Sequence, residues 1–294
     1  MDIKKEGFNL VKINNINGKY SKSKNKYKKF YLIACFILLS YILGFVSHCL
    51  INKKNLKQYK EKTMHLLLSN FICHSQTFED FILFYLFYDI NDGFYIDVGA
   101  NDPVRFSTTK SFYDKGWHGI NIEPLPDKYN LLKTFRKRDI NLQFGIANKE
   151  GNMTLMVKAC ESSIFYDKNA SNLKIININV TTMSIICKKF VPVGTIIQFL
   201  KIDVEGAEKF VLLGIDFVHY RPKVICIESN INKETNTPAY KEWEDILIKN
   251  DYNFAYEYFV NRFYYDNRKK GLKERFDRID YFVNAYKKKF GFSV

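Results

Sequence analysis

Short apolar segments that favour β-strands alternate with segments that favour helices between residues 75 and 266 of this chain. Strands are expected at 94–102, 119–123, 140–146, the first part of 199–208, and 223–229. Helices are expected at 75–88, 107–115, 127–138 and 240–249. Parallel strands need long crossover connections, usually helices, so this alternation predicts an α/β fold with a mostly parallel sheet and right-handed crossovers. The aromatic segments 252–259 and 261–266 predict an antiparallel hairpin that closes one edge of the sheet.

Three further segments carry local signals of their own. Thr77 and Asp80 have the spacing of a capping box at the start of the first helix. Residues 152–197 are rich in Thr, Ile, Val and Asn and have little helical periodicity, which predicts short strands and loops inserted over one end of the sheet. The charged segment 267–290 predicts a solvated terminal helix, with contact to a membrane surface as the alternative.

A long apolar segment precedes the region of alternating strands and helices. Residues 30–51 contain no Asp, Glu, Lys or Arg, and as a helix they would be about 33 Å long at ~1.5 Å per residue. This predicts an uncleaved single-pass membrane protein whose partner is the lipid bilayer, in preference to a signal peptide or a buried core helix. The lysine bias favours a cytosolic N-terminus, but both flanks are basic, so the orientation stays open.

The membrane segment and its flanks predict the domain organisation. Residues 1–29 form a basic mobile tail, 30–51 the transmembrane helix and 52–62 a basic stem, and residues 63–294 form the folded domain. Fourteen Lys and only three acidic residues lie in residues 1–62, so most of the net charge of +14 belongs to the tail and the stem. This distribution argues against a basic groove across the folded domain, and therefore against a nucleic-acid partner.

Acidic residues lie at the carboxyl ends of the predicted strands. They are Asp97, which is followed by Gly99, then Glu123, Asp203 with Glu205, and Glu228. Ligands of open α/β sheets bind at this edge, and an acid after the second strand can accept hydrogen bonds from both hydroxyls of a ribose. The pattern predicts a nucleoside-containing cofactor, although each acid taken alone could equally cap a helix or pair with a surface lysine.

Other common sites lack their sequence signals. The GxGxxG fingerprint is absent, and Pro103 stands where a later glycine would be needed, which argues against a dinucleotide and hydride transfer. The six cysteines form no CxxC pair and the five histidines no HxxxH spacing, so neither a disulfide framework nor a zinc site is predicted. His219 is a weaker candidate base than the acids, and Trp117 or Tyr265 could contact an acceptor, although a core position is favoured for both aromatic residues.

Several stretches, taken in order, resemble the FkbM-type S-adenosylmethionine-dependent methyltransferases. They are FYIDVGANDP (94–103), SFYDKGWHGINIEP (111–124), FLKIDVEGAE (199–208) and RPKVICIES (221–229). SQTFED (75–80) is similar to the entry motif of that family, and WEDIL (243–247) with NRFYY (261–265) is similar to a common ending. The resemblance covers about residues 75–266. It implies a class I methyltransferase-like (Rossmann-like) fold, with a mostly parallel seven-stranded sheet and an antiparallel terminal strand.

The resemblance also implies roles for individual residues. Asp97, Gly99 and Asn101 would line the methionine and ribose of S-adenosylmethionine, Glu123 would hold the ribose hydroxyls, and Ile146 and Ala147 would lie near the adenine. Asp203 with Glu205 would face the methyl donor and the acceptor hydroxyl. Asp203 is expected to act as the base or as a ligand of a divalent cation such as Mg²⁺, for which Asp203, Glu205 and Glu228 could form a cage of oxygen ligands.

The sequence thus predicts a membrane-anchored S-adenosylmethionine-dependent O-methyltransferase that acts on a hydroxyl of a sugar, glycan or glycoconjugate. One alternative is a non-catalytic, membrane-tethered Rossmann-like module that binds a sugar nucleotide or a partner. Another is a glycosyltransferase-type enzyme of glycan assembly, which shares the single-pass layout. Its metal-binding DxD would have to be the DVE of residues 203–205, with Glu in place of the last Asp. Transfer of a labelled methyl group would separate the methyltransferase from the non-catalytic module.

Overall fold

The computed structural model describes residues 70–158, 173–232 and 236–290, all of which lie in the unit Met64–Val294. Their centre is a seven-stranded sheet in the order β11-β12-β8-β7-β1-β2-β3. The strand bounds are β1 Phe94–Val98, β2 His118–Ile122, β3 Ile140–Leu142, β7 Ile197–Ile202, β8 Val224–Glu228, β11 Tyr252–Tyr258 and β12 Asn261–Asp266. Strand β12 is antiparallel to both of its neighbours, whereas β8, β7, β1, β2 and β3 pair in parallel. The predicted α/β fold with a mostly parallel sheet and a reversed terminal strand is confirmed.

The prediction of a single-pass membrane protein is corrected. In the part of the chain that the structure describes, no helix combines the length and the apolar character needed to cross a bilayer. Residues 30–51, on which the prediction rests, lie outside the described residues, as do the predicted tail 1–29 and stem 52–62. The membrane localisation and its orientation are therefore not retained.

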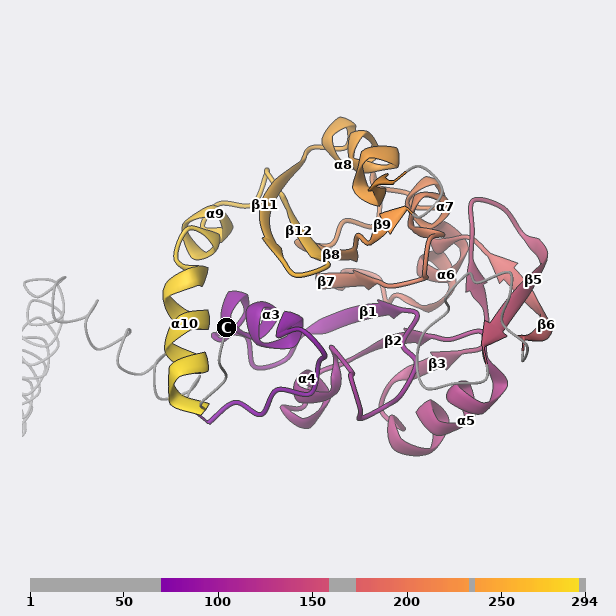
Figure 1. Ribbon diagram of the computed structural model, residues 1–294, viewed down its shortest axis with the longest axis horizontal. Coiled ribbons are helices and arrows are strands. Elements are labelled where there is room, and N and C mark those ends of the chain that lie inside the picture. Colours follow the sequence, from indigo (N-terminus) through magenta and orange to yellow (C-terminus); the bar gives the residue numbers. More distant parts are fainter. Residues whose placement is uncertain (1–69, 159–172, 233–235, 291–294) are drawn as a thin grey trace, which may run out of the picture. The chain divides into compact units, whose positions relative to one another are not determined.

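Helices cover both faces of the sheet (Figure 1). One face carries α3 (Glu79–Leu86), α4 (Lys110–Asp114), α5 (Pro126–Phe135), α9 (Leu272–Phe276) and α10 (Ile279–Phe290). The other face carries α6 (Met183–Phe190), α7 (Glu208–Leu213) and α8 (Glu244–Lys249). Side chains alternate along each strand, so the sheet contributes to two separate hydrophobic clusters, one on each face.

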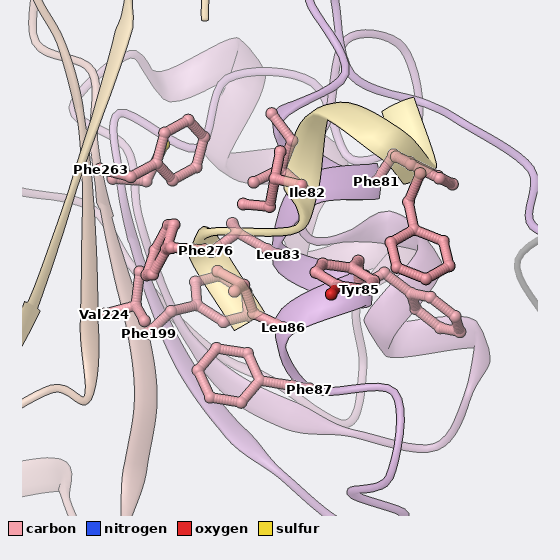
Figure 2. Packing of buried hydrophobic residues seen from close by; sticks show 14 of the residues in the cluster. Phe81, Ile82, Leu83, Tyr85, Leu86, Phe87, Phe199, Val224, Phe263 and Phe276 are labelled. Atoms are coloured by element: carbon pink, nitrogen blue, oxygen red, sulfur yellow. The ribbon is translucent and has the colours of Figure 1, made fainter. Parts of the chain in front are cut away.

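Helix α3 is buried along its whole length because its sequence, EDFILFYL, is apolar on nearly all sides. Figure 2 shows its residues Leu83 and Leu86 packed near Phe199 and Val224 of the sheet. The predicted capping box is not formed, since α3 follows Phe78 in a left-handed conformation without a side-chain cap. Asp80 instead accepts hydrogen bonds from the preceding backbone, with His74 N at 2.6 Å.

The region 145–190 is more regular than its sequence predicts. The strands β4 (Gly145–Ile146), β5 (Gly151–Lys158) and β6 (Leu173–Thr181) form a second sheet, in which β5 and β6 pair along eight residues. The predicted strand 140–146 is therefore divided between two sheets. Helix α6 was not expected; it begins after Thr182, whose hydroxyl accepts a hydrogen bond from Ile185 N. Two shorter strands, β9 (Ile231–Asn232) and β10 (Thr237–Pro238), and a 3₁₀ turn at Ala239–Glu242 precede α8.

The terminal segment packs on the core, so the prediction of a solvated helix at 267–290 is wrong. Ile279, Phe282, Val283 and Tyr286 of α10 are buried in the cluster that contains α3. Their spacing of i, i+3, i+4 and i+7 is the apolar stripe of an amphipathic helix. The lysines at positions 287–289 lie at the end of this helix and obscure the stripe in the composition.

We expect Phe282→Ala to lower the free energy of unfolding by about 3–5 kcal/mol, because it leaves a cavity between α10 and α3. Asn284→Ala, at an exposed position of the same helix, is the control and should change it by less than about 0.5 kcal/mol. Urea unfolding measures both variants. Equal effects of the two substitutions would mean that α10 is not part of the core.

Candidate functional site

The carboxyl ends of β1 and β7 meet at the centre of the sheet. From β1 the chain builds β2 and β3 on one side, and then returns to build β7 and β8 on the other. Strand order therefore reverses between β1 and β7, which is where open α/β sheets bind their ligands. The backbone joins the two ends directly, because Asp203 N donates to Val98 O at 3.0 Å.

Gly99 is required by this close approach. A Cβ atom at position 99 would lie 1.8 Å from the carbonyl oxygen of Asp203, and the φ of Gly99 is +82°. Only glycine lacks the side chain that would clash here, and glycine adopts this left-handed backbone without strain. The structure thus brings Gly99 and Asp203, two predicted site residues, into contact.

Glu123 follows β2 and binds the loop that follows β1. One carboxylate oxygen accepts a hydrogen bond from Asn101 N and the other from Leu125 N, each at 2.8 Å. The side chain is buried, and burial raises the pKa of Glu123 while the two backbone N–H groups oppose that rise. The predicted pair Asn101 and Glu123 therefore lies together, with Asn101 in a left-handed conformation at φ 50°.

Asp97 lies in β1, and its side chain is on the face of the sheet that carries α3 and α4. Its Oδ2 accepts a hydrogen bond from Thr109 Oγ1 at 2.9 Å. Burial raises the pKa of Asp97 to about 6, against the opposing effects of the Thr109 hydroxyl and the positive charge of Lys201. Lys201 is the direct neighbour of Asp97 across the β1–β7 ladder.

Arg136 is a buried residue that the sequence interpretation missed. Its side chain is fully buried and donates to Pro103 O at 2.9 Å and to Ser107 Oγ at 2.7 Å. It also contacts Thr109, the hydrogen-bond donor to Asp97. In the sequence it stands among Lys and Arg residues at a helix end and reads as a surface charge. The structure makes it the residue that holds the segment 103–109.

Lys201 is a second buried cation that the sequence interpretation did not single out. Its Nζ lies 3.4 Å from Asp203 Oδ2 and 3.1 Å from Asn261 Oδ1. The amide of Asn261 is oriented by its other end, since Nδ2 donates to Thr77 Oγ1 at 2.9 Å. Thr77 in turn donates to Glu79, so the segment before α3 is linked to the site by a continuous chain of hydrogen bonds.

Asp203, Glu205 and Glu228 come together as the sequence predicts, with one carboxylate oxygen from each within 4.8 Å of the others. Burial together with repulsion and hydrogen bonding from Asp203 raises the pKa of Glu228 to about 9. Burial alone would raise the pKa of Asp203, but the Lys201 ammonium and the hydrogen bond with Glu228 hold it below its usual range. The arrangement therefore favours one ionised carboxylate, Asp203, beside one protonated carboxyl, Glu228.

Glu205 stands in a strained turn that a further acid stabilises. Its φ is +55°, and Gly206 follows with φ +104°. Oε1 of the buried Glu208 accepts hydrogen bonds from Gly206 N at 3.0 Å and Val204 N at 3.4 Å. Glu208, which begins α7, was not predicted as part of the site, although its place three residues after Glu205 is visible in the sequence.

The acidic cluster does not include the remaining predicted positions. Ile146 and Ala147 are buried, and Ala147 N donates to Thr181 O at the end of β6. A small cavity of about 180 Å³ lies beside the residues that come after Glu123 in the chain. It is lined by Pro124, Pro126, Gln143 and β6 residues 176–179. Trp117 and Tyr265 are both core residues. His219 is exposed and pairs with Asp216. Both residues precede β8, at the amino end of the parallel strands.

Comparison with known proteins identifies the family. Residues 97–256, more than half of the chain, match the methyltransferase FkbM domain. A solved structure, the precorrin-6y C5,15-methyltransferase from Geobacter metallireducens GS-15, is similar with 12% identity and a TM-score of 0.32, over 63% of this chain and 84% of that one. No curated protein matches. The match includes the five acids predicted at the strand ends, and the chain belongs to the methyltransferase FkbM domain family.

Proposed function

We propose that the protein is an S-adenosylmethionine-dependent O-methyltransferase whose acceptor is a hydroxyl of a sugar, glycan or related small molecule. Membership of the family implies S-adenosylmethionine as the methyl donor. The observation that carries the proposal is the contact between the ends of β1 and β7, where Gly99 abuts the backbone carbonyl of Asp203. This contact places residue 203 beside the loop that would hold the donor.

The residues after β1 and β2 fit a nucleoside. Each oxygen of Glu123 accepts one backbone N–H, and a carboxylate oxygen has two lone pairs, so both can accept a further hydrogen bond from a ribose. Asp97, Gly99 and Asn101 would then line the ribose and the methionine part. Ile146 and Ala147 are assigned to the adenine side on the family resemblance. When bound, S-adenosylmethionine supplies a methyl group that its positive sulfur already activates.

Asp203 would act as the general base. Methyl transfer requires the acceptor oxygen about 3 Å from the methyl carbon, in line with the bond that breaks, and removal of the hydroxyl proton as attack proceeds. Asp203 is more than a third exposed at its side chain, whereas Lys201 behind it is almost fully buried. The carboxylate is thus accessible to an acceptor while its charge is stabilised from the protein side. Glu205, two residues beyond, would orient the acceptor hydroxyl.

The experiment is calorimetric titration of the full-length protein with S-adenosylmethionine, followed by transfer of a labelled methyl group to a panel of glycans and hydroxylated small molecules. Binding together with a product methylated at oxygen would support the proposal. Absence of binding at millimolar cofactor would refute it. Transfer to nitrogen or carbon acceptors alone would support methyltransferase activity but contradict the proposal that the acceptor is a hydroxyl.

Glu123→Gln should weaken the binding of S-adenosylmethionine about 10- to 100-fold. The amide NH₂ would face Asn101 N or Leu125 N, so one backbone donor loses its acceptor, and the charge-assisted bonds to the ribose are weakened. Asp92→Asn is the control, because Asp92 is an exposed acid before β1. Titration calorimetry on both variants measures the effect. An unchanged dissociation constant in Glu123→Gln would mean that Glu123 does not bind the ribose.

A further inference from the structure

The acidic cluster of Asp203, Glu205 and Glu228 has the composition of a divalent-cation site, but its surroundings do not fit one. Three carboxylate oxygens within 4.8 Å of one another could serve as ligands of a hard cation such as Mg²⁺. The same cluster already contains a cation of the protein. The Lys201 ammonium lies 3.4 Å from Asp203 Oδ2, and its side chain is 4% exposed.

A divalent ion bound to Asp203 would be placed beside this ammonium. Mg²⁺ binds carboxylate oxygens at about 2.0–2.1 Å, so an ion on Oδ2 of Asp203 would lie within about 6 Å of Nζ. Two cations at that separation repel each other, and the burial of the Lys201 ammonium reduces the screening of this repulsion.

Lys201 is also held in place and is not free to swing away. Asn261 Oδ1 accepts from Nζ at 3.1 Å, and the amide is fixed in that orientation by its bond to Thr77 Oγ1. Asn261 starts β12 directly opposite Glu228, so this support comes from the reversed strand of the sheet. Thr77 comes from the segment before α3, so two separate parts of the chain position the ammonium.

We infer that Lys201 is the resident cation of the acidic cluster, takes the electrostatic place that a divalent metal ion would hold, and makes this methyltransferase independent of metal ions. Lys201 acts through Asp203, whose carboxylate it orients and keeps beside the acceptor, and is therefore a positioning residue. The binding part of the inference concerns the cluster alone. The catalytic part rests on the proposed function.

Titration of the full-length protein with Mn²⁺, followed by electron paramagnetic resonance of the free ion, tests the binding part. Wild-type protein and Asp203→Asn should bind Mn²⁺ equally weakly, at surface sites only. Lys201→Met removes the charge and keeps the aliphatic stem, and should bind Mn²⁺ at least about tenfold more tightly. Lys209→Met, at an exposed position of α7, changes the net charge equally and should behave as wild type.

Two results would overturn the inference. One is Mn²⁺ binding by the wild-type protein that disappears in Asp203→Asn, a comparison that stands even if Lys201→Met fails to fold. The other is a folded Lys201→Met variant that binds Mn²⁺ no better than Lys209→Met. Neither result depends on S-adenosylmethionine binding, so the failure of this inference is distinguishable from the failure of the proposed function.

Methyl transfer in the presence of a chelator tests the catalytic part. The wild-type rate should change by less than about twofold in EDTA. The rate of Lys201→Met should fall and should be restored, at least in part, by added Mn²⁺. Loss of wild-type activity in EDTA with recovery on adding Mg²⁺ would contradict a metal-independent reaction.

Discussion

Asp203→Asn is expected to reduce the rate of methyl transfer by about 10²- to 10⁴-fold, the usual contribution of a positioned general base. The amide cannot accept the hydroxyl proton, although it keeps the shape of the side chain. Binding of S-adenosylmethionine should change by less than about threefold, because the ribose and methionine contacts are assigned to the loops after β1 and β2. Single-turnover transfer and titration calorimetry measure the two effects separately.

The matched control for this prediction is Asp216→Asn. Asp216 precedes β8, at the amino end of the parallel strands, and pairs there with His219. Its replacement should leave the rate unchanged. If Asp203→Asn loses cofactor binding together with activity, Asp203 belongs to the donor site and is not the base. If it retains the full rate, the base is a different residue.

Gly99→Ala is expected to abolish measurable binding of S-adenosylmethionine, with a dissociation constant at least about 100-fold higher. The new Cβ would lie 1.8 Å from Asp203 O, so the ends of β1 and β7 must move apart. Backbone strain at φ +82° would add about 1–3 kcal/mol to the cost in stability. Calorimetric titration and urea unfolding measure both consequences.

Gly116→Ala separates the clash from the strain. Gly116 has φ +102°, and a Cβ there meets no atom within 4 Å, so the variant has the strain without the clash. It should lose about 1–2 kcal/mol of stability and bind the cofactor as the wild type does. Similar cofactor binding by the two alanine variants would show that the contact between the two strand ends does not shape the donor site.

The strand-end acids could be predicted from the sequence because each directly follows a short apolar segment. Asp97, Glu123, Asp203 and Glu228 all terminate such segments, and parallel strands bring their ends to one edge. The family motifs added the order in which these segments occur. The sequence therefore identifies which residues lie at the carboxyl ends of the strands and in which direction the strands run.

The buried cations could not be predicted in the same way. Arg136 and Lys201 look like ordinary charged residues in the sequence, and only the fold places Lys201 against Asn261, sixty residues away. Helix α10 was misjudged for a related reason, because its three terminal lysines hide an apolar stripe. Helix α6 was missed because β-branched residues dominate its surroundings, whereas its stability comes from burying Met183, Ile186 and Cys187.

The measurement that bears most directly on the central claim is a crystal structure of the full-length protein with S-adenosylhomocysteine. We expect the ribose hydroxyls on the carboxylate of Glu123, the sulfur beside Gly99, and the Asp203 carboxylate facing the position of the transferred methyl. Cofactor bound anywhere else, or with its ribose away from Glu123, would contradict a donor site at the carboxyl ends of β1 and β7.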